Sequence, residues 1–420
     1  MPTKTKAKRV AKQSNNVESE NVDVASPAAQ VEFAPLSEKQ NGTLAEPDVL
    51  HPGPQAEFAE MTVAEEPPPA EEDLEYVRVI RALAMIVIVA EHLAFPLIYR
   101  YNEIYISEWW IGTQIYIWGK AGSPLFTMVS GLLLLNPSKR NQTLQVFFKK
   151  RFMKVLIPFL GWSAIYLAWR HYWIGTQFTA RDILVAIVDG PVYYHMWFIQ
   201  MILGLYLATP IMRIYTRNAT RNNMTYFLVV WFITTGFFPI VRRYLGFEIG
   251  IDMYVMVGFM GYFILGYYLR PVKLNRQQMM MCLAAVVIIS LGTMMMTHFL
   301  TVRLDGTFGG FFTMNLSPNI MIMSTVFFLF MKSLDYKKIY ERHPWFSWFV
   351  THISSTSFGV YLVHVMLVED FRSGRPGITL HGMTWHPAIA IPVLTALTMF
   401  VSYLIVKRMQ QIPYVKHIVP

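Results

Sequence analysis

The sequence contains one cysteine, Cys282, in 420 residues. An intrachain disulfide is therefore impossible, and the apolar run around Cys282 favours a buried structural thiol over a nucleophile. The sequence also lacks an HExxH motif, a pair of closely spaced cysteines and a Walker-type glycine loop. These absences leave no recognisable zinc or nucleotide motif.

Charged residues are also scarce, at 15% of the chain, whereas hydrophobic residues make up 54% and aromatic residues 15%. The mean hydropathy is +0.35. A soluble protein of this length would expose far too much apolar surface. The composition therefore predicts an integral membrane protein.

Residues 1–75 have a different composition from the rest. They contain fifteen acidic and six basic residues, five of the six within the first dozen positions, and clustered prolines at 67–69. Such a segment cannot bury enough apolar surface to fold alone, and no apolar stretch followed by a cleavage site marks it as a signal peptide. We expect a disordered cytoplasmic tail; contact of its basic tip with anionic lipid is the alternative.

Apolar stretches of roughly membrane-spanning length recur after residue 76. They predict an all-α membrane bundle of about ten transmembrane helices in a domain covering residues 76–410. The predicted helices cover residues 79–99, 113–135, 152–171, 195–213, 224–241, 253–269, 279–300, 317–332, 353–369 and 387–406.

The distribution of lysine and arginine predicts the orientation. With the N-terminus in the cytoplasm, the predicted inner loops hold 21 Lys and Arg residues and the outer loops hold 8. The positive-inside rule then places both termini in the cytoplasm, with residues 411–420 as a short tail. Residues 76–420 carry 30 basic and 12 acidic residues. Topology accounts for this excess, so we expect no nucleic-acid partner.

Arg81 and His92 lie eleven residues apart in the first predicted helix. Eleven helical steps separate them by about 16 Å along the axis but by only ~20° around it. Both side chains are costly in hydrocarbon and face the same way. A cation near the interface and an imidazole deeper in the same face predict an anion held at the mouth and proton chemistry inside.

The second predicted helix contains Lys120 followed by a polar stripe of Ser123, Thr127 and Ser130. Pro124 frees the Lys120 carbonyl from its helical hydrogen bond. Packing between helices explains the hydroxyls but explains Lys120 poorly. A wet cavity is the alternative explanation.

The ninth predicted helix repeats this pattern with Ser357, Tyr361 and His364. His364 is expected near the depth of His92, so that two imidazoles share one layer, provided the two helices adjoin. A packing role and a polar cavity both remain open for these histidines.

Basic residues also cluster before the third predicted helix, at Lys149, Lys150, Arg151 and Lys154. Membrane topology and lipid headgroups explain them as well as a clamp for a phosphate-bearing ligand does.

Five motifs in order give residues 76–410 a resemblance to the acyltransferase-3 family of integral membrane enzymes, close to bacterial surface-polysaccharide O-acetyltransferases. The spacing of Arg81 and His92 resembles the family's Arg-x10-His signature. The other similar segments are residues 123–131 (SPLFTMVSG), 148–158 (FKKRFMKVLIP), 194–206 (YHMWFIQMILGLY) and 357–364 (SFGVYLVH).

The resemblance implies transfer of an acyl group, usually acetyl from acetyl-CoA, onto a glycan hydroxyl at the bacterial inner membrane. Acetyl-CoA is then a substrate, and no permanently bound cofactor or metal is expected. His92, with an unperturbed pKa of about 6.5, suits the general base, and Lys120 or Ser130 could stabilise an oxyanion. The expected donor-binding residues are Arg81, Lys149, Lys150, Arg151 and Lys154, and the expected acceptor-binding residues are His195, Trp197, Tyr361 and His364.

Two positions depart from the family pattern. Arg78 stands where an acid usually precedes the signature arginine, and Lys120 stands where an arginine is common. Glu91 could compensate by facing Lys120 or by orienting His92.

A proton-coupled transporter or flippase is the competing hypothesis, since buried cations and histidines also guide anions and relay protons. It predicts no consumption of acyl-CoA. A non-catalytic scaffold or sensor is a third hypothesis, and it does not explain why Arg81 and His92 are aligned on one helix face.

Overall fold

The computed structural model describes residues 75–136, 142–246, 258–375 and 377–420, and these residues form helices and connecting turns without a strand. All of the predicted N-terminal tail except Glu75 lies outside this part, so its disorder stays a prediction. The first helices are α1 (Glu75–Ile98), α2 (Ile106–Gly119), α3 (Gly122–Leu134), α4 (Leu144–Arg151), α5 (Ile157–Trp169), α6 (Ala180–Val188), α7 (Trp197–Asn218) and α8 (Arg221–Phe232). The others are α9 (Phe238–Leu245), α10 (Met260–Tyr268), α11 (Arg276–Arg303), α12 (Pro318–Lys332), α13 (Tyr336–Arg342), α14 (Pro344–Ser373) and α15 (Pro387–Gln411).

Eight helical segments of the described chain are long and apolar enough to cross a membrane. The all-α, polytopic class predicted from the sequence is confirmed, and the chain is a multi-pass membrane protein. The eight segments are Glu75–Ile98, Leu144–Ile174, Tyr194–Asn218, Arg221–Leu245, Arg276–Arg303, Gly310–Lys332, Pro344–Ser373 and Pro387–Gln411.

The two other predicted helices, 113–135 and 253–269, take different forms. The first is broken into α2 and α3 around Lys120 and Ala121, because Pro124 cannot donate a helical hydrogen bond to the Lys120 carbonyl. The second contains α10, whose preceding residues 253–257 lie outside the described part.

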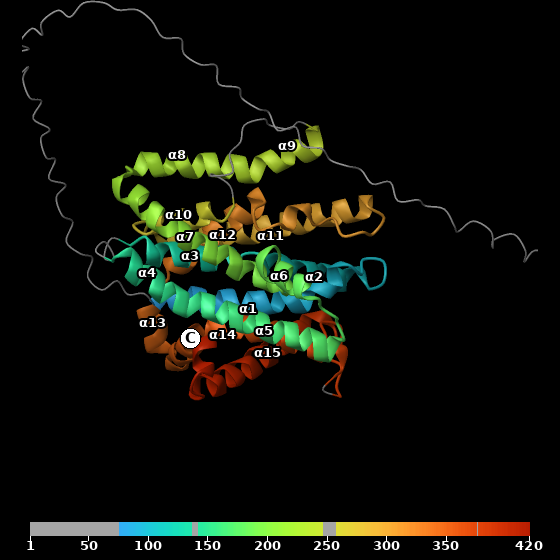
Figure 1. The fold of residues 1–420 in the computed structure, drawn as a ribbon. Helices are drawn as coiled ribbons and strands as arrows, with labels where there is room; N and C mark the ends of the chain where they lie inside the picture. The colour runs from blue at the N-terminus through green and yellow to red at the C-terminus, as the bar shows by residue number, and fades with distance from the viewer. Residues whose placement is uncertain (1–74, 137–141, 247–257, 376) are drawn as a thin grey trace, which may run out of the picture. The chain divides into compact units, whose positions relative to one another are not determined.

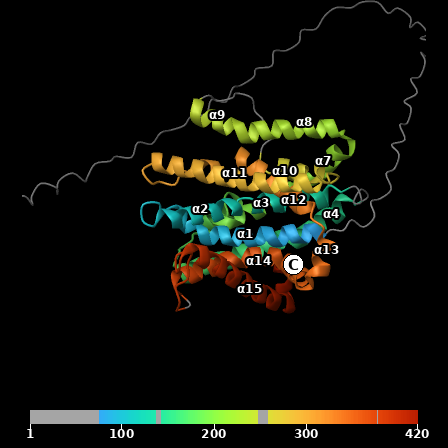
Figure 2. The same cartoon turned by 180° about the vertical axis from the view of Figure 1, so that it is seen from behind.

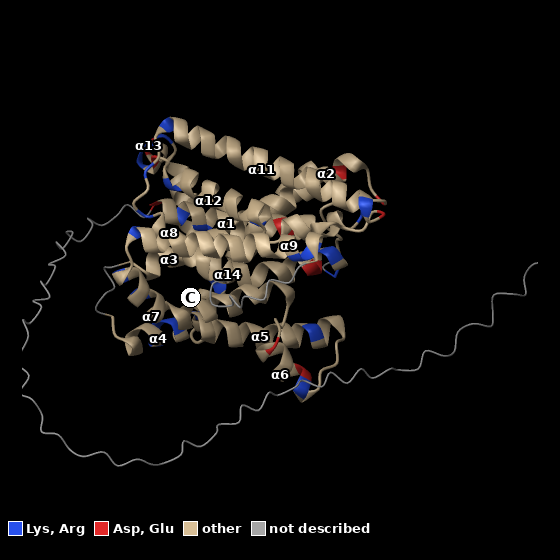
Figure 3. Cartoon of the chain, turned by 90° about the horizontal axis from the view of Figure 1, so that it is seen from above, with Lys and Arg blue, Asp and Glu red and all other residues tan. Residues whose placement is uncertain are grey.

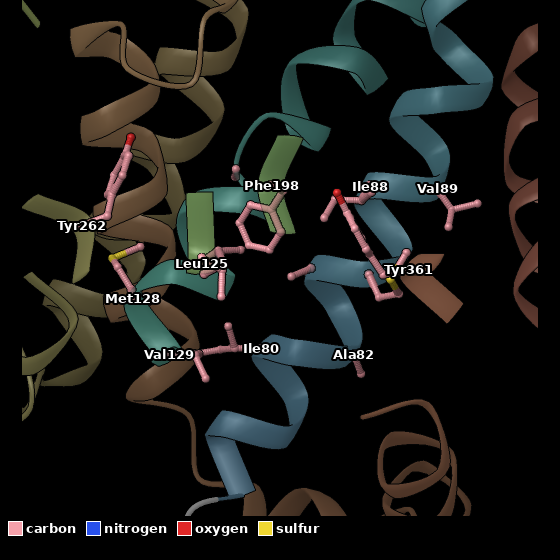
Figure 4. Packing of buried hydrophobic residues seen from close by; sticks show 14 of the residues in the cluster. Ile80, Ala82, Ile88, Val89, Leu125, Met128, Val129, Phe198, Tyr262 and Tyr361 are labelled. Carbon is pink, nitrogen blue, oxygen red and sulfur yellow. The ribbon is translucent and has the colours of Figure 1, made fainter. Parts of the chain in front are cut away.

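Helix α1 lies at the centre of the bundle and contacts α2, α3, α12, α14 and α15. In both Figure 1 and Figure 2 it lies between α8 and α9 at one edge and α15 at the other. Its fully buried residues include Ile80, Met85 and Val89. Figure 4 shows Ile80 near Leu125 and Val129 of α3, in the apolar layer that joins the two helices. The side chains of α1 are therefore fixed by neighbours on several sides.

Helices α3 and α10 approach closely through two glycines. A Cβ on Gly131 would lie 1.7 Å from the Phe263 carbonyl oxygen. A Cβ on Gly266 would lie 2.0 Å from the Met128 carbonyl oxygen. Small residues of this kind let membrane helices bring their backbones together. The α3–α10 contact thus depends on the absence of side chains at these positions.

Gly131→Ala is expected to destabilise the protein by about 1–3 kcal/mol, because the added methyl group forces α3 and α10 apart. The measurement is the thermal unfolding midpoint of the purified protein in detergent. Gly204→Ala is the matched control, since a Cβ at this position of α7 meets nothing within 4 Å. Equal midpoints for the two variants would contradict this packing.

Charged residues gather toward the two ends of the helices, as Figure 3 shows. One end, which we call the basic end, carries α4, α13, the start of α1 and the end of α7. The opposite end carries α6, α9 and the start of α2, with both signs of charge. The positive-inside rule predicts that the basic end faces the cytoplasm.

The predicted C-terminal tail, 411–420, packs back onto the bundle. The Trp162 indole on α5 donates to the Ile418 carbonyl at 2.9 Å, and the Gln410 amide donates to the Val419 carbonyl at 3.1 Å. Val419 is completely buried. This segment is therefore part of the folded domain.

Candidate active site

A cavity of about 350 Å³ lies among α1, α3, the α4–α5 span, α7 and α14. Six residues singled out in the sequence line it together, although they come from four separate segments. They are Arg81, Ser130, Arg151, Lys154, Ser357 and Tyr361. The structure thus brings part of the predicted site into one space.

Arg81 presents its guanidinium to this cavity and has no carboxylate partner among the described residues. Its Nη2 donates to the Ser357 hydroxyl at 3.1 Å, and that hydroxyl donates to the Ser354 carbonyl. Arg78, which stands in the place of the usual family acid, instead pairs with Glu75 at 2.6 Å. A serine therefore orients Arg81, and no carboxylate in the described part of the chain pairs with its positive charge.

Two further cations reach the cavity from the α4–α5 span. The chain forms a π-helical turn over Phe152–Leu156, which contains Lys154. Such turns shift side chains around the helix and are frequent at functional sites. The Arg151 guanidinium lies 5.4 Å from the centre of the Tyr206 ring, which also lines the cavity. Thus Arg81, Arg151 and Lys154 converge on one cavity.

The described residues that line the cavity include no aspartate or glutamate. Arg81 and Arg151 are half-buried and Lys154 is exposed; three cations without an acid create a positive potential, which favours a polyanion. Lys149 and Lys150 are exposed on α4 and do not line the cavity. The predicted phosphate clamp is therefore divided, with two of its lysines outside.

Three histidines form a second cluster. The His92 and His364 rings are 5.2 Å apart, and the His364 and His195 rings are 5.6 Å apart. The expectation that His92 and His364 share one layer is confirmed. The described residues include no group of three His, Cys, Asp or Glu side chains placed to hold a metal ion.

The hydrogen bonds distinguish the three imidazoles. His364 Nδ1 lies 2.7 Å from the Tyr361 carbonyl, which can only accept, so Nδ1 carries the hydrogen. His364 Nε2 and both nitrogens of His195 are buried without a hydrogen-bond partner among the described residues. His92 is the only one of the three that is partly exposed, so it is the ring that a substrate can reach.

Tyr361 separates the cavity from the histidines. It lines the cavity, its ring centre lies 5.6 Å from that of His364 and 5.7 Å from that of Phe198, and its hydroxyl donates to the His195 carbonyl. Arg81 lines the cavity and His92 does not, so the cavity ends before His92; Tyr361 and Phe198, both labelled in Figure 4, belong to its wall.

Lys120 forms an ion pair with Glu91 at 2.6 Å, and its ammonium lies 4.2 Å from the centre of the Tyr116 ring. Gly119 permits this approach, since a Cβ there would lie 2.3 Å from the Glu91 Cβ. The freed Lys120 carbonyl accepts a hydrogen bond from the Asn315 amide at 3.0 Å. Glu91 thus faces Lys120, as the sequence suggested.

The two predicted oxyanion-stabilising residues lie in different places. Lys120 does not line the cavity, and its ammonium is engaged by Glu91. Ser130 lines the cavity and donates to the Phe126 carbonyl at 2.9 Å. Use of Lys120 for an oxyanion would require the ion pair to open.

Of the predicted acceptor-binding residues, Trp197 lies apart from the others. Its ring packs against Phe198 and Phe259, and it does not line the cavity. The sequence reasoning missed Tyr194 as a site residue, although its ring lies 5.3 Å from His92. Its position in the 194–206 motif was the available signal.

Long apolar helices around a cation-lined cavity and a buried histidine cluster define a polytopic membrane protein with a polar site inside its bundle. The acyltransferase-3 family model, described as an acyltransferase domain, matches residues 74–407, and the chain belongs to this family. No match was found among curated proteins or solved structures. Membership implies an acyl donor and an acceptor, and it favours an acyltransferase over the transporter hypothesis.

Proposed function

We propose that the protein is an O-acyltransferase of the bacterial inner membrane that moves acetyl from acetyl-CoA to a hydroxyl of a cell-envelope or lipid-linked glycan. One observation carries this proposal: an acid-free cavity lined by Arg81, Arg151 and Lys154 adjoins a cluster in which His92 is accessible. A site for a polyanionic donor and a site for proton transfer are thus neighbours.

The donor binds with its phosphates in the cavity. Guanidinium and ammonium groups suit phosphate oxygens, and the guanidinium can bind two of them at once. Eleven residues of α1 place His92 about 16 Å beyond Arg81, a distance that a pantetheine arm can span. The thioester reaches His92 when Tyr361 and Phe198 move aside.

The reaction needs a base because a sugar hydroxyl is a poor nucleophile. His92 takes the hydroxyl proton while the oxygen forms a bond to the thioester carbonyl carbon. The tetrahedral intermediate then collapses, the carbon–sulfur bond breaks, and the proton passes from His92 to the coenzyme A thiolate. His92 ends the cycle neutral.

The test supplies membranes containing the protein with isotopically labelled acetyl-CoA and then analyses the envelope polysaccharide by mass spectrometry. The proposal expects ester-linked label that is absent from membranes lacking the protein. No label in either sample, together with proton-dependent glycan movement, would establish the transporter instead.

Removing residues 413–420 is expected to raise the KM for acetyl-CoA by about three- to tenfold, a modest loss of binding free energy. Pro420 lines the cavity, and without this wall water enters and weakens the attraction between cations and phosphates. The measurement is the initial rate against acetyl-CoA concentration. Trp162→Phe, which removes the hydrogen bond to Ile418 and part of a buried ring but keeps the segment, is expected to cause a smaller rise. An unchanged KM in the deletion would remove the segment from the donor site.

A further inference from the structure

A polar and aromatic cluster lies on the far side of the histidines from the cavity, where α14 ends. Tyr194 connects this cluster to the histidines. Its ring lies 5.3 Å from the His92 ring, and its hydroxyl donates to Glu369 Oε1 at 3.3 Å. Glu369 also pairs with Arg372. The carboxylate is therefore linked to the candidate base through one tyrosine.

Aromatic rings extend this cluster. The Tyr193 ring lies 4.9 Å from the Tyr194 ring and 5.6 Å from the Trp169 ring. Burial, together with the negative charge of Glu369, raises the pKa of Tyr193 to about 12. Its hydroxyl therefore stays protonated at neutral pH and remains a hydrogen-bond donor.

A second ion pair stands beside these rings. Arg375 donates to Asp370 at 3.0 Å, and its guanidinium lies 5.7 Å from the centre of the Trp169 ring. The cluster thus holds two carboxylates, each paired with a guanidinium, and a third guanidinium, that of Arg170, donates to the Val192 carbonyl beside Tyr193. Unlike the cavity, it contains acids. Phosphates favour the acid-free cavity, whereas carboxylates paired with guanidiniums offer both acceptors and donors to a neutral ligand with many hydroxyls.

Helix-end charge pairing alone does not explain this cluster. An ion pair three residues apart, such as Glu369 with Arg372, is common and contributes little at an exposed position. The Glu369 side chain, however, is only 12% exposed, and Tyr194 reaches it from a different segment. Tyr194 itself is 43% exposed, so a ligand can reach the point where the tyrosine, the carboxylate and the histidine meet.

We infer that Tyr194, Glu369 and Arg372 form a subsite for a neutral polyhydroxylated acceptor and direct its reacting hydroxyl toward His92. This inference rests on the proposed acyl transfer. The carboxylate accepts hydrogen bonds from acceptor hydroxyls, the guanidinium and Tyr194 donate to acceptor oxygens, and the aromatic rings pack against the C–H faces of the sugar.

The test measures acetyl transfer to envelope polysaccharide from which esters have been removed with mild alkali. Glu369→Gln is expected to raise the KM for this polysaccharide about tenfold, as for the loss of one charge-assisted hydrogen bond. The KM for acetyl-CoA should stay unchanged. Tyr194→Phe keeps the ring packing and should produce a smaller rise in the same constant.

Glu103→Gln is the matched control, because Glu103 also pairs with an arginine three residues away but its side chain is 67% exposed. It is expected to behave as wild type. An unchanged polysaccharide KM in both Glu369→Gln and Tyr194→Phe would overturn the subsite.

Failure of the acyl-transfer proposal gives a different pattern. The melting temperature of the intact wild-type protein in detergent is measured with and without the same polysaccharide, alongside Glu369→Gln. A rise seen only in wild type, without any acetyl transfer, supports the subsite and refutes the reaction. Transfer by wild type without a Glu369-dependent rise refutes the subsite and leaves the reaction standing.

Discussion

His92→Ala is expected to abolish acetyl transfer, with a rate loss of about 10²–10⁴-fold, the usual contribution of a general base. His92 is the accessible ring of its cluster, whereas His364 Nδ1 is held by the Tyr361 carbonyl and His195 is buried. Neither neighbour can take over without rearrangement. The measurement is transfer of labelled acetyl to polysaccharide by membranes with equal amounts of inserted protein.

His352→Ala is the control for the loss of a histidine. His352 lies on α14, twelve residues before His364, and its ring packs on Trp348. Twelve helical residues correspond to about 18 Å, so this change should leave transfer intact. Normal transfer by the His92 variant would remove His92 from the chemistry.

Arg81→Ala is expected to raise the KM for acetyl-CoA by about 10- to 100-fold, because a charge-assisted hydrogen bond to phosphate is lost from a cavity of low dielectric constant. Arg81→Lys keeps the charge but loses the paired donors of the guanidinium, so it should restore only part of the affinity. The KM for the acceptor should not change. The measurement is a two-substrate kinetic analysis in detergent or proteoliposomes.

Arg78→Ala provides the matched control one helical turn away on α1. The Arg78 side chain is 52% exposed, pairs with Glu75 and does not line the cavity. Its replacement should leave both Michaelis constants unchanged. If Arg78→Ala and Arg81→Ala raised the KM for acetyl-CoA equally, the positive charge of α1 would attract the donor without a specific contact. Arg81 would then not belong to the donor site.

The sequence predicted the parts of this site that depend on helical periodicity. Arg81 and His92 lie on one face of α1, and the pattern in α14 placed Tyr361 and His364 on a matching face. Those periodicities, with the length of the apolar runs, were enough to predict the all-α membrane class and the similar depth of His92 and His364, whereas the contact between their two helices had to be assumed.

Contacts between distant segments could not be predicted in this way. No spacing indicates that Tyr361 and Phe198 meet between the cavity and the histidines, or that Tyr194 reaches Glu369 across 175 positions of the chain. The exposure of Lys149 and Lys150 likewise depends on how α4 turns into the π-helical segment. A lone sequence records the residue types but not these three-dimensional contacts.

The cavity wall formed by Tyr361 and Phe198 has a consequence for the energy supply of the cell. A polar channel open at both faces would let ions run down their gradients and would discharge the membrane potential. In the proposed reaction, an aromatic wall at this place lets an acetyl group cross while the bilayer stays sealed. That reaction, as proposed, has the donor and the acceptor each arrive and depart on its own side, so that no carrier has to bring coenzyme A out of the cell.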